Sequence, residues 1–404
     1  MTDIKQLERP SGRVSKRRAS AACAAVMGTV FGLCNSPVWA GAREQAKVIH
    51  DRLVGTPASD ATLTQMETDI MAGRLVDAAM YAINPANADA APFYNVVLKN
   101  FATPWTSRDQ SVFAPLNDYT ATVIGVVRDD EDFRHILYDD VIYVPQAGYS
   151  TTSNAPYEAL ESSNADLSNS NVLRRSAQSA VNGLPSTATA GVITSRAASE
   201  AFFIDGTNRA MFRFTLVNHL CRDMEQVHDT SRAPDRIRQD VTRSPGGDSR
   251  IFLNNCVGCH SGMDPMAQAF AYYDFDETVS RLVYTPGQVQ PKYLINSDNF
   301  KFGFVTPNDS WENRWRQGPN GGSLSQGLGW DAALPGSGQG AKSLGQELAN
   351  SRAFAECQVE KVFRHVCFRG PTSTERANVT NVFTSGGYKL KQVFAEAAVA
   401  CRGP

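Results

Sequence analysis

The sequence predicts a mainly α protein, multi-helical with long loops, stapled by two disulfides. Apolar residues recur at steps of three and four in several segments, which is typical of helices with one buried face. Other segments are rich in Gly, Ser, Thr and Asn and predict loops. Of eight cysteines, four stand outside both the first 40 residues and any short motif, and these predict covalent cross-links.

The composition is that of a globular chain. Its 404 residues include 42% hydrophobic and 20% charged positions, which excludes collagen, a coiled coil and a disordered chain. The length suggests two modules rather than one. No long basic run occurs after residue 18, so nucleic acid is not an expected partner.

Residues 1–40 have the layout of a secretory signal peptide. A basic cluster at 13–18 precedes an uncharged stretch that ends in Val38-Trp39-Ala40. We expect cleavage after Ala40 and export to the periplasm, the extracellular space or the cell surface. The alternative is an uncleaved anchor, because about 20 uncharged residues could span a bilayer. No later segment is long and apolar enough to do so, and we expect no transmembrane segment in the mature chain.

Residues 41–145 are expected to form an N-terminal helical module. Here 46–54 is amphipathic, and Asp60 can cap a longer helix whose apolar residues have helical spacing (Leu63, Met66, Ile70). The segments 93–101 and 123–144 are apolar and aromatic. Residues 146–200 are expected to be a loop or linker, because 146–191 is dense in Ser, Thr, Asn and Ala.

Residues 201–404 are expected to form a second module with a C-terminal helical region. Its clearest helix is 207–229, and one apolar stripe is formed by Met211, Phe214, Val217, Cys221, Met224 and His228. His219 falls off this stripe, so we expect it to face solvent. Nine Gly in 318–345 predict a loop, and 344–368 is predicted to be one helix.

The four separate cysteines are Cys221, Cys357, Cys367 and Cys401. In an exported chain they predict two disulfides. Cys357 and Cys367 would lie about 15 Å apart along one helix, beyond the roughly 7 Å that a disulfide spans. Cys221 therefore pairs with one of them and Cys401 with the other. An up-and-down path of the C-terminal region favours Cys221–Cys357 and Cys367–Cys401, with Cys221–Cys367 as the alternative.

The clearest chemical motif is Cys256-Val257-Gly258-Cys259-His260. Cys-x-x-Cys-His is the attachment pattern of c-type haem, and this composition would give it by chance roughly 0.002 times. The two thiols form thioethers with the haem vinyl groups, and His260 becomes the proximal iron ligand. We therefore expect one covalent haem c in a cytochrome-c-like haem module. The apolar residues expected to pack on it are Phe252, Phe270, Tyr272 and Phe275.

The motif has two other possible uses. A redox-active dithiol also uses Cys-x-x-Cys, but it needs a βαβ context that the neighbouring sequence does not show. A zinc site would need a second pair of ligands at finger spacing, and none is present. Haem attachment is the interpretation that the sequence favours.

The sequence leaves several candidates for the sixth iron ligand. No Met follows Met266, so the usual downstream Met ligand is missing. The distal candidates are His228, His365 and Met224, with His228 preferred; water or an empty position is the alternative. Arg281 follows the haem segment and could pair with a propionate.

The motif and its surroundings resemble the secreted single-haem proteins called planctomycete-type cytochromes. The likeness begins with Cys256 to His260 followed by Met263-Asp264-Pro265 and Tyr273-Asp274-Phe275-Asp276. It extends to four further segments, 52–57, 191–196, 362–369 and 385–388. Two positions depart from the family pattern: Ala267 stands where Gly is usual and Tyr272 where an acidic residue is expected. The resemblance implies export and haem attachment, and implies no substrate.

The function that we expect from the sequence is electron transfer by an exported c-type cytochrome. Its expected partners are a redox partner protein and the haem-attachment machinery. One alternative is an extracellular haem enzyme of oxygenase or peroxidase type, which the large size of the chain favours. Another is a structural surface protein that haem only stabilises.

Overall fold

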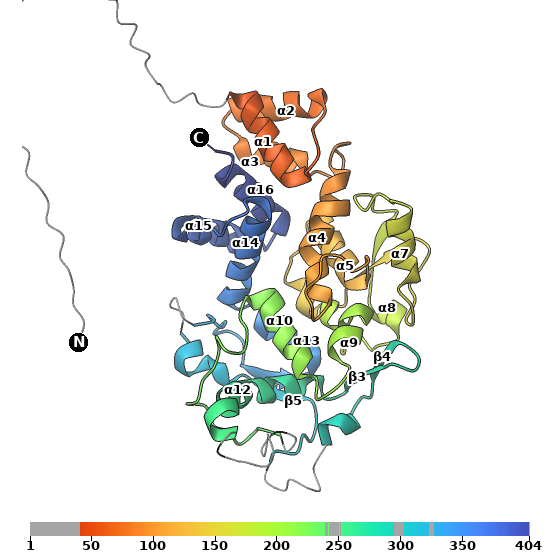
Figure 1. The fold of residues 1–404 in the computed structure, drawn as a ribbon, viewed down its shortest axis with the longest axis vertical. Helices are drawn as coiled ribbons and strands as arrows, with labels where there is room; N and C mark the ends of the chain where they lie inside the picture. Colours follow the sequence, from red (N-terminus) through yellow and green to blue (C-terminus); the bar gives the residue numbers. More distant parts are fainter. Residues whose placement is uncertain are drawn as a thin grey trace, which may run out of the picture. The chain divides into compact units, whose positions relative to one another are not determined.

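A computed structural model describes residues 41–238, 241, 250, 252–294, 303–322 and 327–403. The expected signal peptide at 1–40 lies outside the described residues. The described residues form one compact, mainly helical unit (Figure 1). One main hydrophobic core includes residues from the first helix to the last, and two small clusters lie beside it.

The first three helices pack together and against the last one. They are α1 (Ala42–Val54), α2 (Asp60–Met71) and α3 (Leu75–Ala82), and their C-terminal partner is α16 (Leu390–Ala400). Ser59, and not the expected Asp60, caps α2 by accepting a hydrogen bond from the Thr62 amide, and Asp60 is the first helical residue. The helical prediction for 41–145 is therefore confirmed in this part, and the two ends of the unit's chain lie side by side (Figure 1).

A buried helix, α5 (Asp118–Arg128), lies near the middle of the unit (Figure 1). It follows η1 (Phe93–Leu98), α4 (Lys99–Ala102) and η2 (Thr103–Thr106) and precedes α6 (His135–Tyr138). Every residue of α5 is buried. Gly125 has no side chain because a Cβ there would collide with the ring of Tyr143 in the next strand. That strand, β1 (Ile142–Pro145), accounts for the β-branched end of the segment 123–144.

The segment expected as a loop or linker, 146–200, contains regular structure. It holds α7 (Ala155–Ser162), β2 (Leu173–Ser176), α8 (Ser179–Asn182) and η3 (Gly191–Thr194), and α9 (Arg196–Phe202) follows. β2 pairs antiparallel with β1. Its Ser and Asn residues serve turns and caps, as where the Ser195 hydroxyl accepts from the Ala198 amide at the start of α9. The composition gave a wrong prediction of a loop or linker here because these residue types suit ordered turns as well as linkers.

The helix predicted over 207–229 is shorter than expected. The structure has α10 (Arg209–Thr215) continued by a π-helical turn, η4 (Leu216–Leu220), and it ends at Cys221, whose φ of 53° is left-handed. The left-handed backbone at Cys221 turns the chain away from the helix axis, and a disulfide holds Cys221 in place. Met224 and His228 therefore lie in a loop and not on a helical stripe.

The lower half holds the motif segment and two hairpins. Here η5 (Phe252–Cys256) leads into α12 (Val257–Ala267) and η6 (Gln268–Phe270). β3 (Tyr273–Asp276) pairs with β4 (Arg281–Tyr284), and β5 (Ser310–Glu312) pairs with β6 (Ser337–Gln339), both antiparallel. Three short 3₁₀ turns complete this part: η7 (Pro291–Leu294), η8 (Arg314–Arg316) and η9 (Gly318–Asn320).

The C-terminal region consists of α13 (Gly340–Ala349), α14 (Arg352–Val366), α15 (Ser373–Ser385) and α16. The single helix predicted over 344–368 is wrong, because it breaks at Ser351, whose hydroxyl caps α14 by accepting from the Phe354 amide. Cys357 still lies on α14 and Cys367 at its end, so the reason for not pairing them holds. The disulfides are Cys221–Cys357 and Cys367–Cys401, and the favoured pairing is confirmed.

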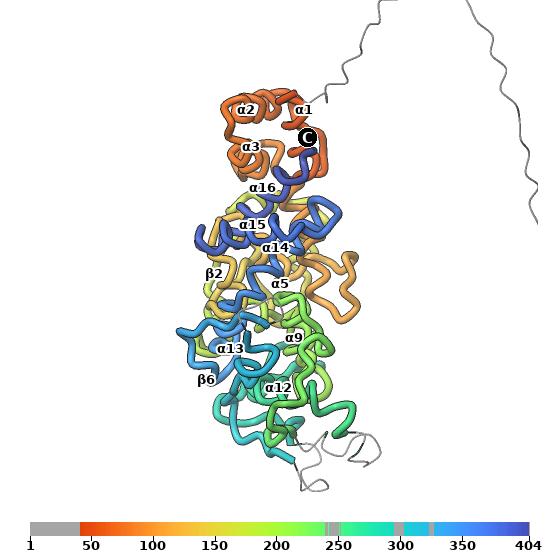
Figure 2. The backbone as a smooth tube through the Cα atoms, turned by 90° about the vertical axis from the view of Figure 1, so that its left-hand side faces the viewer, coloured from red at the N-terminus to blue at the C-terminus, as the bar shows by residue number. Residues whose placement is uncertain are grey.

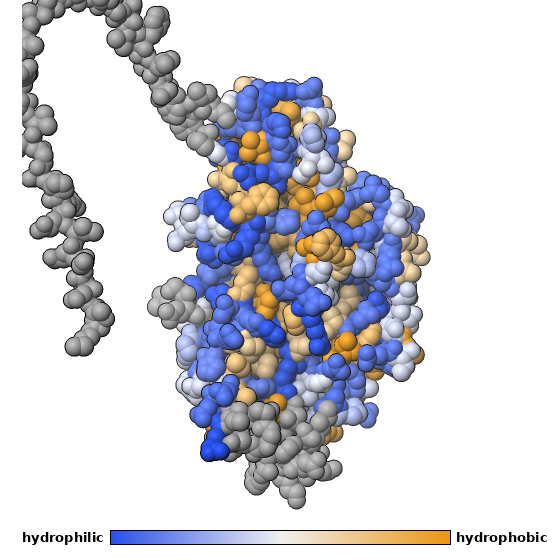
Figure 3. Space-filling model, viewed as in Figure 1, coloured by the Kyte–Doolittle hydropathy of each residue, from blue (hydrophilic) through white to orange (hydrophobic). Residues whose placement is uncertain are grey.

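Three Trp residues in or beside the Gly-rich segment 318–345 belong to the core or pack against it. Trp311 and Trp315 are buried, and Trp330 is packed against the main core. Polar residues cover most of the face shown in Figure 3, with apolar residues in scattered patches. Within the described part of the chain, no helix combines the length and the apolar character needed to cross a bilayer.

Candidate functional site

The motif residues share one face at the start of α12. Cys256 ends η5, and Cys259 and His260 follow in the first turn of α12. Because successive helical residues are about 100° apart, positions 256, 259 and 260 point to the same side. Both cysteines are free thiols, and each is partly exposed. The structure therefore brings together the three residues that the sequence selects.

His260 is oriented by a carboxylate one turn further along α12. Its Nδ1 lies 3.0 Å from Oδ1 of Asp264. This contact uses Nδ1, so Nε2 is the nitrogen left to bind a metal. A carboxylate on the second nitrogen is the usual way in which proteins fix the tautomer of a ligating His and raise its basicity.

Asp264 is fully buried and is held by two arginines. Arg209 makes a bidentate pair with it, Nε to Oδ1 at 2.7 Å and Nη2 to Oδ2 at 2.8 Å. The backbone amide of Arg238 donates to Oδ2 at 3.2 Å, and its guanidinium lies 3.8 Å from Oδ1. Burial alone would raise the pKa of Asp264, but Arg209, Arg238 and His260 hold this pKa well below its usual range. The carboxylate therefore stays charged behind His260.

None of these three supporting residues was expected from the sequence to hold His260. Asp264 lies in the segment that resembles the cytochrome family, and its place on the face of His260 could have been predicted because it stands four residues further along the helix. Arg209 and Arg238 are 55 and 26 residues from Asp264 in the sequence, and no local pattern connects them with it.

The opposite face of α12 packs closely on neighbouring segments. The ring of His228 lies where a Cβ of Gly258 would be, and Trp315 occupies the same place at Gly262. The Asp229 amide donates to the carbonyl of Gly258 at 2.9 Å. Position 258 points away from 256, 259 and 260, so His228 lies behind the motif. This placement does not support His228 as the distal ligand.

Met224 lies beside the motif. Its carbonyl oxygen is 3.6 Å from the sulfur of Cys259, and its side chain is partly buried. Burial, followed by the charges of Cys256, Glu225 and Asp223, raises the pKa of Cys259. A nucleophilic dithiol needs a lowered thiol pKa, so this environment is unlike that of a redox-active pair.

His365 and Arg281 lie elsewhere. His365 is near the end of α14, where its ring contacts Phe101 edge-on at 5.7 Å. That end of α14 contacts α1, since Arg52 donates to the Val366 carbonyl at 3.1 Å, and Figures 1 and 2 place α1 and α12 at opposite ends of the unit. Arg281 faces Asp276 at the end of the β3–β4 hairpin. Neither residue is brought to the motif.

Of the four apolar residues expected around a haem, one adjoins the motif. Phe252 forms a small cluster with Ile237 and Val257, and Cys256 packs against it. The other three are engaged elsewhere: Phe270 contacts Phe203, Tyr272 packs with Tyr293, and Phe275 belongs to the main core. They are buried by other protein side chains. An apolar sequence segment alone does not show whether protein or haem covers it.

His219 is buried, so the expectation that it faces solvent is wrong. Its Nε2 lies 2.7 Å from the hydroxyl of Tyr119, and its ring contacts Trp105 edge-on. Burial, and secondly the charge of Lys361, lower the pKa of His219 well below its usual range. The π-helical turn η4 shifts the helical register and turns this residue toward the core.

These residues fit the protein side of a c-type haem site. Two unpaired thiols at the required spacing share a face with an imidazole whose Nε2 is available and whose Nδ1 is held by a buried carboxylate. Over the described ranges, no three Cys, His, Asp or Glu side chains converge as ligands of a metal ion. A c-type haem requires only His260 of the motif as an iron ligand, since the thiols bond to carbon.

No protein-family model matches the chain, and no curated protein or solved structure is significantly similar to it.

Proposed function

We propose that this chain is an exported c-type cytochrome with one haem attached to Cys256 and Cys259, and that it transfers electrons in the periplasm or at the cell surface. The observation that carries the proposal is the arrangement of the two free thiols beside His260, with Nδ1 of that imidazole bound to buried Asp264. Haem would supply reversible one-electron chemistry.

The chain's own residues would set the properties of that haem. His260 would be the proximal ligand through Nε2, and Asp264 would fix its ring and increase its basicity. The charges of Arg209 and Arg238 keep Asp264 ionised. They also reduce the amount by which Asp264 raises the basicity of the His260 imidazole. A more basic ligand favours the oxidised iron, so this pair would lower the reduction potential.

Covalent attachment is tested by producing the protein together with haem-attachment machinery. The haem should stay with the polypeptide on a denaturing gel and resist acidified organic solvent. Cys256→Ala and Cys259→Ala should each lose one thioether, which is measured as the intact mass and the shift of the pyridine haemochrome band. The double variant Cys367→Ala/Cys401→Ala is the control and should keep full attachment. Haem that is extracted by the solvent from the unaltered protein would contradict the proposal.

An oxidising compartment is supported by the two disulfides, which persist mainly in exported proteins. Electron transfer there requires a redox partner protein. Rapid reduction by a small dye, together with slow or absent turnover of peroxide, is the expected kinetic behaviour.

A haem enzyme is the second candidate, because a cavity of about 510 Å³ adjoins the loop that contacts Cys259. Asp223 and Gln226 of this loop line the cavity, while Met224 lies at the motif. Carbon monoxide distinguishes the two functions. A six-coordinate reduced haem that does not bind carbon monoxide supports electron transfer, and rapid binding supports catalysis.

A further inference from the structure

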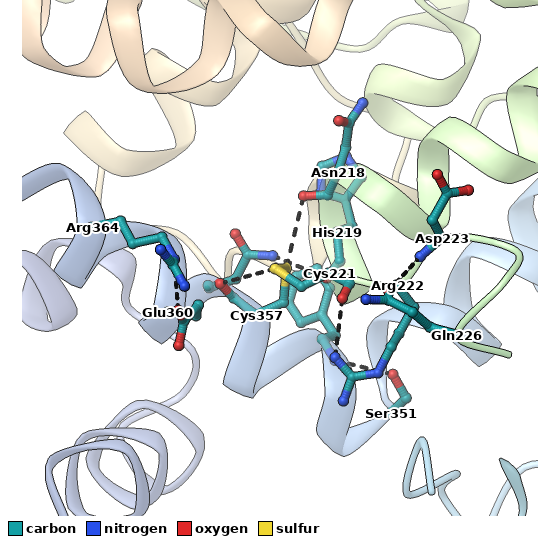
Figure 4. The surroundings of a disulfide bond; sticks show 12 residues. Asn218, His219, Cys221, Arg222, Asp223, Gln226, Ser351, Cys357, Glu360 and Arg364 are labelled. Atoms are coloured by element: carbon teal, nitrogen blue, oxygen red, sulfur yellow. Dashed lines mark hydrogen bonds and ion pairs between the residues drawn. A yellow bond between two sulfur atoms is a disulfide. The ribbon is translucent and has the colours of Figure 1, made fainter. Parts of the chain in front are cut away.

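A cavity of about 510 Å³ lies between α14 and the turn that follows η4. The Cys221–Cys357 disulfide forms part of its wall. Figure 4 shows Glu360 and Arg364 on one side of this bond and Arg222 with Gln226 on the other. Apolar and polar side chains both line the cavity: Gln110, Val217, Cys221, Arg222, Asp223, Gln226, Ala353, Glu356, Cys357, Glu360, Lys361, Arg364 and Arg376.

The acidic side chains of this cavity already have cationic partners. Glu360 pairs with Arg364 at 2.6 Å and with Arg376 at 2.7 Å. Asp223 pairs with Arg213 at 2.7 Å, and Glu356 lies 3.5 Å from Arg352. These carboxylates therefore do not neutralise the remaining cations of the cavity.

Two lining cations have no carboxylate partner among the described residues. Lys361 is one turn beyond Cys357 on α14, and its ammonium lies 4.5 Å from the centre of the Trp105 ring. It makes no hydrogen bond or ion pair within the described part of the chain. Arg222 donates one hydrogen bond, to the carbonyl of Cys221 at 3.0 Å, and pairs with no acid there. Lys361 is half-buried, and holding an ammonium there without a counter-charge is costly, so burial lowers the pKa of Lys361 to about 7.

We propose that this cavity binds a small organic anion, with Lys361 and Arg222 contacting its carboxylate or phosphate oxygens. A guanidinium offers two parallel donors to such an oxyanion, and an ammonium offers a compact charge. Gln110 and Gln226 add amide groups for the polar part of the ligand, and Val217 and Ala353 cover its carbon atoms. The site does not depend on haem attachment and goes beyond the proposed electron transfer.

The experiment is calorimetric titration of the purified full chain with sodium succinate and, separately, with sodium phosphate. Sodium chloride keeps the ionic strength constant and serves as the reference anion. Lys361→Met and Arg222→Gln should each weaken binding about 10-fold to 100-fold, as expected when a charged hydrogen-bond partner is lost. Arg364→Gln is the matched control: it removes a lining cation that already has an acidic partner, and affinity should change less than about threefold.

The two probes distinguish the sources of the oxyanion. Binding of succinate alone identifies a carboxylate ligand, and binding of phosphate alone a phosphate ligand. Lys361→Arg keeps the charge and should keep binding, so it separates a charge effect from misfolding of Lys361→Met. Equal affinity in the unaltered protein and in a folded Lys361→Met variant would overturn the proposal. So would dissociation constants weaker than about 10 mM for both probes.

Discussion

Asp264 illustrates how one buried side chain can serve both the motif and the fold. Asp264→Asn keeps the shape but removes the charge that His260, Arg209 and Arg238 share. We expect the free energy of unfolding to fall by about 3–5 kcal/mol, because two arginines lose a buried partner. In haem-loaded protein the reduction potential should rise, since the imidazole becomes less basic.

The matched control is Asp223→Asn. Asp223 makes the same bidentate pair, with Arg213 at 2.7 Å for both contacts, but at an exposed position. Asp223→Asn should lower the free energy of unfolding by less than about 1 kcal/mol. Urea unfolding and potentiometry measure the two effects. Similar losses in the two variants would mean that burial of Asp264 is not what makes its pair strong.

The sixth iron ligand of the proposed haem can be identified by single substitutions. Among the three candidates from the sequence, only Met224 lies beside a motif thiol, with its backbone carbonyl 3.6 Å from the sulfur of Cys259. His228 lies behind Gly258, and His365 contacts Phe101. We expect Met224→Ala to change the spectrum of the haem-loaded protein and to abolish any near-infrared band of Met ligation. His228→Ala and His365→Ala serve as comparisons and should keep the spectrum; a changed spectrum in either one would reassign the ligand.

Lys361 gives a pH dependence whose sign can be derived. Its folded pKa is about 7 and its ordinary value 10.5, so between these values the unfolded chain binds more protons at this lysine. The contribution of Lys361 to the free energy of unfolding therefore rises as pH increases from about 7 to 10.5. Below pH 7 the partly buried lysine is charged and destabilises the fold most. His219, the nearby titrating group, has a lowered pKa and stays neutral in this window.

We expect Lys361→Met to be more stable than the unaltered protein at pH 7, by on the order of 1–3 kcal/mol. The difference should shrink at pH 9, as measured by urea unfolding without reductant. A difference that stays constant over this range would show that the lysine does not titrate there.

The residues of the candidate site were predictable where they share a short motif. Cys256, Cys259 and His260 were selected from their spacing alone, because haem attachment requires that spacing. Arg238 was not predictable, because its contact with Asp264 depends on how two segments meet. Nor was the burial of His219, since a π-helical turn changes which side of the helix it occupies.

At the scale of elements, helices were predictable and their ends less so. The helix at 60–71 follows from its apolar spacing, although its cap is Ser59 and not Asp60, and α14 was expected within a longer helix. The prediction for 207–229 ran too far because the apolar spacing continues past Cys221, where the backbone is left-handed. At 344–368 the apolar spacing continues through the break at Ser351, which looks like an ordinary helix residue until its cap is seen.

The two disulfides should differ in how much they stabilise the protein. Cys221–Cys357 closes 136 residue steps and Cys367–Cys401 closes 34. Loop entropy assigns them roughly 5 and roughly 4 kcal/mol of stabilisation, as upper figures. The double variant Cys221→Ala/Cys357→Ala should therefore lower the melting temperature more than Cys367→Ala/Cys401→Ala does. Calorimetry without reductant compares them, and the reverse order would indicate that local packing, not loop length, decides the loss.

At the scale of the whole molecule, the sequence could not show how distant segments meet. α16 packs on the first helices, and α14 meets η4 through a disulfide, so the C-terminal region contacts both halves of the unit. Such contacts join residues hundreds of positions apart and leave no periodic signal. The cavity beside Lys361 is also of this kind: its walls come from separate segments, at 110, 217–226 and 353–376.

The loop after Cys221 connects the two sites that we propose. Asp223 and Gln226 line the cavity, the Met224 carbonyl is 3.6 Å from Cys259, and His228 packs on Gly258. An anion in the cavity would add negative charge on the side of the loop opposite the proposed haem, and this would favour oxidised iron. We therefore expect saturating succinate or phosphate to lower the reduction potential, by on the order of 10–60 mV.

Linkage requires the reverse effect as well: the oxidised protein should bind the anion more tightly than the reduced protein, by a factor of about 1.5–10 for that shift. Potentiometric titration with and without the anion, at constant ionic strength, measures the first effect, and calorimetry of each redox state measures the second. In Lys361→Met both effects should be much smaller at the anion concentration that saturates the unaltered protein, while the haem stays attached. A shift that persists in this variant would have to arise from anions elsewhere on the molecule, and the loop would then not couple the cavity to the motif.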